Sequence, residues 1–369
     1  MYRNNFSKNI YIAMMTQNRH YYRHAIILLI IFLLSGCASI NYYAQSIHGQ
    51  FEVLQKQQEI DDVLKDQNIP DTLRNNLITV LALRDFSIQQ LGLPENGSYL
   101  SYADLERDYV IWNIFATEEF SLKPLTWCYL VVGCLSYRGY FSQTDAQQHA
   151  TELKKQGYDI YLGGVSAYST LGWFDDPVLN TMLRWSDIRL ATVMFHELAH
   201  QQLYVKNDTE FNEAYADAVA HIGVTKWLTQ KPEKKLLTEY QQSQDQEKEF
   251  IDLIMRFKSI LNELYQSTEK DETIRQRKQQ ALQKMSNEYS RISQNWEKDS
   301  YKKWFSSGIN NAKLAAIVTY RKHVPAFINI YEKLGKDLNR FYSFSKSLSN
   351  CDSIKREKIL EKRQIEFEC

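Results

Sequence analysis

Apolar residues spaced three and four positions apart run through much of the chain, and this spacing predicts amphipathic helices. The first helical stretch covers residues 40–91, within which Pro70-Asp71 begins a second helix. Residues 145–156 are expected to form another helix. Beyond residue 230 the same spacing continues through two longer stretches, residues 236–265 and 274–296. The protein is therefore expected to be predominantly helical.

Shorter runs rich in β-branched and aromatic residues predict a small sheet in the first half of the chain. The predicted strands are residues 109–116, 129–132 and 158–165, and residues 137–141 form a short strand or a loop. Residues 92–97, with two glycines and a proline, are expected to form a turn. The sequence thus combines a small sheet with many helices.

The last third of the chain is expected to be helical throughout. A charged segment at residues 268–271 separates the two long stretches, which predicts an antiparallel helical hairpin. Its charges belong to a solvated face, and a coiled coil that binds a partner is the alternative. Residues 304–342 are expected to form a mixed apolar and polar helix, the far wall of a cleft.

An apolar run near the amino terminus predicts an export signal. Residues 25–34 follow several basic residues and lead into Leu34-Ser35-Gly36-Cys37. The run is shorter than the ~20 residues of a membrane-spanning helix, and small residues before a cysteine are typical of a lipoprotein signal that leaves Cys37 lipidated. Ala38 and Ser39 then resemble the sorting pattern of bacterial outer-membrane lipoproteins. We expect a cell-envelope protein, lipid-anchored at the periplasmic face of the outer membrane.

Charge and cysteine content restrict the partners and the compartment. The 44 basic and 44 acidic residues cancel, and we find no Gly-rich phosphate loop, so nucleic acid is not an expected partner. Four cysteines follow Cys37, and they allow three complete pairings, of which Cys128 with Cys134 is the first to test. None has Cys-x-x-Cys spacing, which favours a structural role for these cysteines and agrees with an oxidising compartment.

The clearest chemical feature is the motif His196-Glu197-Leu198-Ala199-His200. Residues four apart on a helix lie on one face, ~6 Å apart along its axis. The two imidazoles can therefore bind one metal ion, and zinc is the usual ion for this pattern. Glu197 is well placed to take a proton from a metal-bound water.

A second half-motif, Asn212-Glu213 with Asp217, follows a polar break at residues 206–208. Asp208 or Thr209 can cap a new helix that ends near Gly223. Counting outward from the turn places Glu213 level with His200 and Asp217 level with His196. We therefore predict Glu213 as the third metal ligand and Asp217 as a carboxylate that orients His196. Two histidines and one glutamate leave a fourth position for water, which indicates catalysis.

Other interpretations of these motifs remain open. The first motif alone also occurs by chance in helices whose histidines are packed or solvated, and the second half-motif is what favours the metal. One alternative is a non-catalytic envelope lipoprotein that binds peptide or cell-wall material and has a structural metal site. Another is a periplasmic assembly or quality-control factor that acts through the helical hairpin.

Several motifs together carry a resemblance to known proteins. Phe195 to Gln201 with Phe211-Asn212-Glu213 looks like the zinc peptidases that use a glutamate ligand. The chain more closely resembles a bacterial family of lipoproteins described as aminopeptidases, through Val132-Gly133-Cys134, residues 137–141, residues 167–174 and Asn310-Asn311-Ala312. The resemblance runs from the lipidation motif to near the carboxyl end. The twelve-residue spacer between His200 and Glu213 is shorter than in thermolysin-like enzymes.

The resemblance implies a fold and an activity. The expected fold is α+β, predominantly helical, with a zincin-like catalytic core, a small sheet and a C-terminal helical region. We divide the chain into residues 1–36, a signal peptide; 37–230, the catalytic region; and 231–369, a helical region that completes the cleft. The implied activity is that of a zinc-dependent peptidase, an aminopeptidase, with one zinc ion and a peptide substrate.

Substrate contacts are predicted less directly. Residues 168–174 are expected to form an edge strand that pairs with an extended peptide, with a buried aromatic loop as the alternative. The substrate-binding candidates there are Tyr168, Ser169, Thr170, Leu171 and Gly172. Either Tyr320 or His323 is a candidate to stabilise the oxyanion, although a structural role is common for such residues. The candidates to bind the substrate amino terminus are Asp175, Asp176 and Glu210, which spacing does not distinguish.

Overall fold

The computed structural model describes residues 41–129, 133–170 and 172–369, without the side chains of Thr319 and Tyr320. The chain divides into two compact units, Met1–Phe51 and Glu52–Cys369. In the first unit, residues 41–51 are helical. The predicted signal peptide and its cysteine, Cys37, lie outside the described residues.

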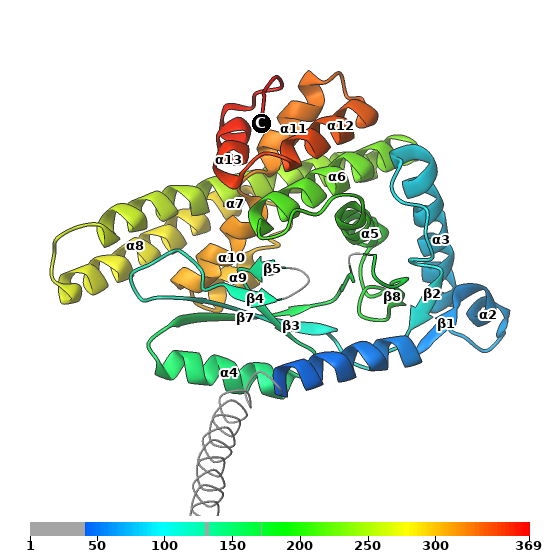
Figure 1. The fold of residues 1–369 in the computed structure, drawn as a ribbon, viewed down its shortest axis with the longest axis horizontal. Coiled ribbons are helices and arrows are strands. Elements are labelled where there is room, and N and C mark those ends of the chain that lie inside the picture. The colour runs from blue at the N-terminus through cyan, green and yellow to red at the C-terminus, as the bar shows by residue number, and fades with distance from the viewer. Residues whose placement is uncertain (1–40, 130–132, 171) are drawn as a thin grey trace, which may run out of the picture. The chain divides into compact units, whose positions relative to one another are not determined.

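The second unit consists mostly of helices (Figure 1). The predicted helix start at Pro70-Asp71 is confirmed, because Pro70 is the N-cap residue of α3. The helices in the described part of this unit are α2 (Ile60–Lys65), α3 (Asp71–Leu91), α4 (Gln143–Lys155), α5 (Asp187–Gln202), α6 (Thr209–Thr229), α7 (Lys234–Tyr265), α8 (Asp271–Ile292), the 3-10 helix η1 (Ser293–Asn295), α9 (Lys302–Ser306), α10 (Asn311–Arg321), α11 (Val324–Lys333), α12 (Leu338–Ser349) and α13 (Ser353–Lys362).

The described strands form three small sheets. The strands are β1 (Gln57–Glu59), β2 (Ser101–Ala103), β3 (Ile111–Thr117), β4 (Trp127–Tyr129), β5 (Gly133–Leu135), β6 (Arg138–Tyr140), β7 (Asp159–Val165) and β8 (Val178–Leu179). The largest sheet has the order β6-β3-β7, and β3 is antiparallel to both neighbours. Two further sheets have the orders β1-β2-β8 and β4-β5. The combination of many helices with small sheets confirms the predicted α+β class in its coarse form.

The largest sheet lies between α4 and α10 (Figure 1). Its central strand β3 is buried over most of its length because helices cover both faces. Phe115 of β3 packs against Ala312 and Ala316 of α10, where the small side chains allow a close approach. The sheet thereby sets where α10 begins.

Helices α5 and α6 form the centre of the main hydrophobic core. The core-facing residues of α5 recur at helical spacing: Leu190, Ala191, Met194, Phe195 and Leu198. Helix α6 is buried nearly all round, so its apolar residues do not mark one face.

The predicted end of the second metal-motif helix near Gly223 is wrong, because α6 continues to Thr229. Gly223 instead permits a close approach between helices. A Cβ atom there would lie 2.7 Å from Leu91 Cδ1 and 2.7 Å from Phe195 Cδ2. A glycine within a helix can therefore mark a packing contact rather than a helix end.

The predicted helical hairpin is confirmed as α7 and α8, which share a second hydrophobic core. By contrast, residues 304–342 do not form the single mixed helix that their spacing predicted. The segment contains the end of α9, all of α10 and α11, and the start of α12. Pro325, in the first turn of α11, agrees with a helix start at that point.

Two disulfides join the four cysteines of the described part of the chain. Cys128 pairs with Cys134, the pairing chosen first for testing, and Cys351 pairs with Cys369. The predicted domain boundary at residue 230 falls within the second unit, between α6 and α7. Across the residues that the structure describes, no helix has both the length and the hydrophobicity needed to span a bilayer.

Candidate metal centre

Helix α5 carries the two predicted histidine ligands. Ser186 caps its first turn by accepting a hydrogen bond from the backbone N–H of Arg189, and Asp187 adds a negative charge near the helix N-terminus. Because the apolar side chains of α5 face the core, His196 and His200 project together toward α6. His200 is buried and His196 is mostly buried.

The turn between α5 and α6 is shaped by the side chain of Asn212 and by the backbone conformation of Asn207. Asn212 accepts a hydrogen bond from the Val205 N–H at 2.7 Å and donates one to the Val205 carbonyl at 2.8 Å. Asn207 has φ +66°, a left-handed conformation that asparagine tolerates well. The Asp208 side chain caps α6 by accepting a hydrogen bond from the Phe211 N–H at 3.1 Å. Asp208 was one of the two residues predicted to cap this helix. Asn212 thus closes the turn that directs Glu213 toward α5.

Three side chains converge on one point. His196 Nε2 lies 3.0 Å from His200 Nε2 and 3.4 Å from Glu213 Oε2, and His200 Nε2 lies 3.7 Å from Glu213 Oε2. A tetrahedral zinc ion with bonds of ~2.0–2.1 Å separates its ligand atoms by about 3.3 Å. The three donor atoms therefore have the spacing and chemistry of a metal site.

Asp217 lies level with His196, as the counting argument predicted. Its Oδ1 is 2.8 Å from His196 Nδ1. When Asp217 accepts the proton on Nδ1, the lone pair of Nε2 is left facing Glu213 and His200. Burial alone would raise the pKa of Asp217, but the charge of Arg321 and the bond to His196 lower it, so this carboxylate is ionised.

Glu213 is also ionised. Burial alone would raise its pKa, but hydrogen bonding to His196 and His200 and their charges lower the pKa to about 2. The side chain is only 10% exposed, so solvent competes little for its oxygens. A buried carboxylate beside two imidazoles is a ready anionic ligand.

Glu197 differs from these two carboxylates. Burial raises its pKa most strongly, and the charges of Glu213 and Asp176 add to that effect, while His196 and His200 oppose it. A carboxylate whose pKa is raised accepts a proton more readily and can later release it. Glu197 therefore has the electrostatic setting of a general base.

Two tyrosines near the site carried no recognisable sequence signal. Tyr99 is buried, has φ +64°, and lies near enough to Glu197 and Asp176 for their charges to add to the effect of burial in raising its pKa. Tyr204 stacks edge to face on His200 at a centroid distance of 6.4 Å. Burial and the charge of Glu213 raise the pKa of Tyr204 to about 12, so its hydroxyl stays protonated.

The predicted edge strand at residues 168–174 is wrong, because the described residues of this segment, 168–170 and 172–174, form no strand. The Asp176 carboxylate accepts hydrogen bonds from the Ser169 hydroxyl at 3.1 Å and from the Thr170 N–H and hydroxyl at 3.0 and 2.7 Å. Gly172 has φ +81°, which an extended strand does not allow. Side-chain bonds to the local backbone thus replace strand pairing here.

The same loop is attached to α5. Gln201, the residue after His200, donates to Asp176 Oδ2 at 3.3 Å and to the Ser98 hydroxyl at 3.2 Å. A Cβ atom on Gly172 would lie 3.9 Å from Gln201 Cγ. This loop, which contacts α5, contains the substrate-binding candidates Tyr168, Ser169, Thr170 and Gly172. The fifth candidate, Leu171, lies outside the described residues.

The candidates to bind a substrate amino terminus are now distinguishable. Asp176 is 2% exposed and its carboxylate is used to hold the loop. Asp175 is exposed and accepts a hydrogen bond from the Gly97 N–H at 3.0 Å. Glu210 lies 3.8 Å from both Lys322 and His323, so its charge is already paired. All three carboxylates therefore have partners, and Asp175 is distinguished by its exposure.

The structure describes the side chain of only one of the two oxyanion candidates, Tyr320 and His323. The side chain of Tyr320 lies outside the described part of α10. His323 lines a cavity of about 260 Å³ together with Asp208, Glu210, Arg356 and Glu357. That cavity does not include the three converging ligands, so the structure gives His323 a place apart from the metal centre.

His323 nevertheless predicts a pH dependence of stability. Burial, with a contribution from Lys322, lowers its pKa to about 4, so the folded protein holds it neutral while the unfolded chain protonates it below ~6.5. Stability is therefore lost as pH falls from ~6.5 toward 4. When the pH falls from 7 to 5, we expect the free energy of unfolding to decrease by roughly 2 kcal/mol less in His323→Gln than in wild type. Urea unfolding at the two pH values measures this difference. Equal losses in the two proteins would contradict the buried, neutral state of His323.

Together, the fold and the site define a class: a predominantly helical α+β protein with a His-His-Glu arrangement that can hold a metal ion. The chain belongs to the family described as "Putative aminopeptidase", whose model matches residues 41–360. No curated protein and no solved structure matches the chain. The family description suggests a peptidase, and the matched region contains Glu197, Asp217 and the three converging ligands.

Proposed function

We propose that this protein is a zinc-dependent aminopeptidase. The observation that carries the proposal is the convergence of His196, His200 and Glu213 at the spacing of a tetrahedral zinc site, with Glu197 beside them. Metal-assisted hydrolysis needs a metal site with an open position and an adjacent base. These residues supply three ligands and such a base.

Zinc fits the donor set better than calcium or magnesium. Calcium and magnesium prefer six or more oxygen ligands, whereas two imidazoles and one carboxylate suit zinc. A bound zinc ion would polarise the scissile carbonyl and make a water molecule more acidic at neutral pH. The remaining steps are carried out by side chains.

Glu197 is the proposed general base and then the general acid. Its carboxylate takes a proton from the attacking water, and the protonated form then delivers that proton to the leaving amine. The raised pKa of Glu197 supports both steps, because such a carboxyl can hold a proton between them. Asp217 meanwhile keeps the His196 ring in the tautomer that leaves Nε2 available.

We also propose that the α5–turn–α6 unit and the β6-β3-β7 sheet form a zincin-like core. The paired half-motifs on two helices joined by a short turn support this proposal, as does the peptidase family. In this proposal the loop containing Tyr168 and Gly172 borders the substrate site, since Gln201 ties that loop to α5.

We further propose an envelope location with a lipid attached at Cys37. The motif Leu34-Ser35-Gly36-Cys37 supports it. The two disulfides add independent support, because disulfides persist in the periplasm and not in a reducing cytosol. The protein would then act on peptides at the periplasmic face of the outer membrane.

Peptides with free and acetylated amino termini test the aminopeptidase assignment. We expect stepwise removal of the first residue from the free peptide and at least about 100-fold slower cleavage of the acetylated one. Burying an unpaired partner of the missing ammonium costs on the order of 3 kcal/mol. Mass spectrometry of the products distinguishes the cases, with Glu197→Gln as the inactive control. Equal cleavage of both peptides at internal bonds would instead indicate an endopeptidase.

A further inference from the structure

The carboxylate that orients His196 is itself held by an arginine from another helix. Arg321, the last residue of α10, places Nη1 2.9 Å from Asp217 Oδ2. Its Nη2 lies 3.0 Å from Glu247 Oε1 of α7. The four side chains form a continuous path from the metal centre to the helical hairpin: His196, Asp217, Arg321 and Glu247.

This arrangement fixes the orientation of the Asp217 carboxylate. Oδ1 contacts His196 and Oδ2 contacts Arg321, so each oxygen has a different partner. A carboxylate with one partner can rotate about its side-chain bond, whereas one with two partners on separate helices cannot do so freely. The Arg321 contact is an ion pair without hydrogen-bond geometry, so it is charge attraction that holds Oδ2 on the side of the guanidinium.

Glu247 serves the arginine in the same way. Side-chain exposure along the path is low, at 10% for Asp217, 19% for Glu247 and 30% for Arg321. Burial would disfavour the charge on Arg321, but the charges of Asp217 and Glu247 more than offset that effect and raise its pKa. The arginine therefore remains a cation held between two carboxylates.

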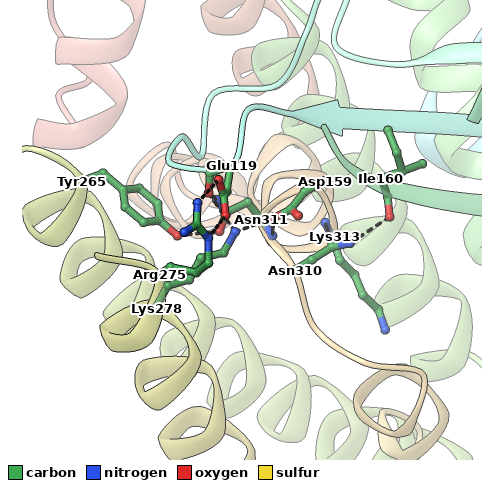
Figure 2. Close-up of polar contacts among 9 residues, drawn as sticks. All are labelled: Glu119, Asp159, Ile160, Tyr265, Arg275, Lys278, Asn310, Asn311 and Lys313. Carbon is green, nitrogen blue, oxygen red and sulfur yellow. Dashed lines mark hydrogen bonds and ion pairs between the residues drawn. The ribbon is translucent and has the colours of Figure 1, made fainter. Parts of the chain in front are cut away.

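The opposite end of α10 is fixed by a second polar cluster (Figure 2). The backbone N–H of Asn311 donates to Asp159 Oδ2 at 3.1 Å, and its side-chain amide donates to the Glu119 carbonyl at 2.9 Å. Tyr265 of α7 donates to Asn311 Oδ1 at 2.9 Å, and Lys278 of α8 contacts Asp159 Oδ2 at 2.7 Å. The start of α10 is therefore bonded directly to β7 and α7, and to α8 through Asp159.

Figure 2 shows further hydrogen bonds in this polar cluster. Asn310 caps α10 and donates its side-chain amide to the Ile160 carbonyl at 2.9 Å. Arg275 of α8 holds Glu119 with two bonds, at 2.7 and 3.0 Å. Both ends of α10 are thus set by the hairpin, one through this cluster and the other through Glu247.

We propose that Arg321 and Glu247 are positioning residues that hold Asp217, and through it His196, in the geometry that binds zinc. The inference rests on the proposed function. It gives the α7–α8 hairpin a role: Glu247 of α7 lies two residues beyond Asp217 on this path, and Arg321 of α10 connects them. The hairpin then determines metal affinity without touching substrate.

The test measures zinc affinity by competition with a fluorescent chelator, independently of peptide cleavage. We expect Arg321→Met to weaken zinc binding roughly 10–100-fold, the usual effect of losing a partner of a metal ligand. Arg321→Lys should recover part of the loss, and Glu247→Gln should cause a smaller loss in the same direction. The visible spectrum of the cobalt(II)-substituted protein should change in Arg321→Met, because the His196 ring is less well held.

The control is Arg256→Met, which removes another arginine–glutamate pair of the hairpin, to Glu288 at 2.9 Å. It should leave zinc affinity unchanged. If Arg321→Met lowers only the melting temperature of the metal-free protein and keeps the wild-type zinc affinity, Arg321 is merely structural and the inference is overturned. Should Arg321→Met not fold, Glu247→Gln decides, and wild-type affinity there overturns it equally. A wild-type protein that binds no zinc would instead refute the proposed function itself.

Discussion

Glu197→Gln is expected to reduce kcat for peptide hydrolysis by roughly 10²–10⁴-fold, the usual contribution of a general acid–base group. Glutamine preserves the shape of the side chain but cannot accept the proton of the attacking water. Because Glu197 is not among the three converging ligands, zinc content should stay at one ion per chain. Steady-state kinetics on a free-amine peptide, combined with elemental analysis, measures both quantities.

Glu210→Gln is a matched control for this experiment. Glu210 is also a carboxyl whose pKa is raised mainly by burial, but it lies beside Lys322 and His323 in the separate cavity. Its variant should keep activity close to wild type. Full activity in Glu197→Gln would remove Glu197 from the mechanism. Zinc binding by both proteins without peptide hydrolysis by either would instead favour the non-catalytic lipoprotein.

Removal of one predicted ligand should greatly reduce the affinity for zinc. We expect His200→Ala and Glu213→Ala to weaken zinc binding by about 100-fold or more and to lose activity at ordinary zinc concentrations. Zinc sites bind with ~10–16 kcal/mol in total, so one ligand contributes on the order of 3 kcal/mol. Zinc titration of chelator-treated protein measures the affinity, and activity should return when zinc is added back to wild type.

His221→Ala provides the comparison for His200→Ala. His221 lies on α6, the helix of Glu213, and is paired with Gln244 of α7 at 3.0 Å, away from the three ligands. Its loss should leave zinc affinity unchanged. Wild-type affinity in both ligand variants would mean that the ion binds elsewhere.

The core of the site was predictable because it is local in sequence. His196, His200 and Glu213 lie on two helices joined by one turn, and helix geometry alone places them at matching levels. Asp217 follows from the same count and lies 2.8 Å from His196 as expected. Periodicity likewise predicted α7 and α8, which are long and strongly amphipathic.

The predictions that were wrong concern segments whose structure depends on contacts between residues far apart in the sequence. Residues 168–174 contain strand-forming aromatics, but Asp176 draws Ser169 and Thr170 into a loop. The glycine at position 223 is a packing contact with α3 and α5 rather than a helix end. No local pattern reveals such tertiary preferences, because the partner lies elsewhere in the chain.

The same reason explains why Arg321 and Glu247 could not be found from the sequence. Arg321 is separated from Asp217 by four intervening helices and is one of 44 basic residues in a chain with no net charge. Only packing of α10 against α6 and α7 gives it a function. His323, close to it in sequence, lines a cavity that does not include Arg321, so proximity along the chain was no guide to its role.

Anomalous diffraction at the zinc edge, from crystals of zinc-replete protein, tests the central claim most directly. A single strong peak is expected ~2.0–2.2 Å from His196 Nε2, His200 Nε2 and a Glu213 carboxylate oxygen. A peak at another position, or none at this one with Glu213 turned away from the two histidines, would contradict the account.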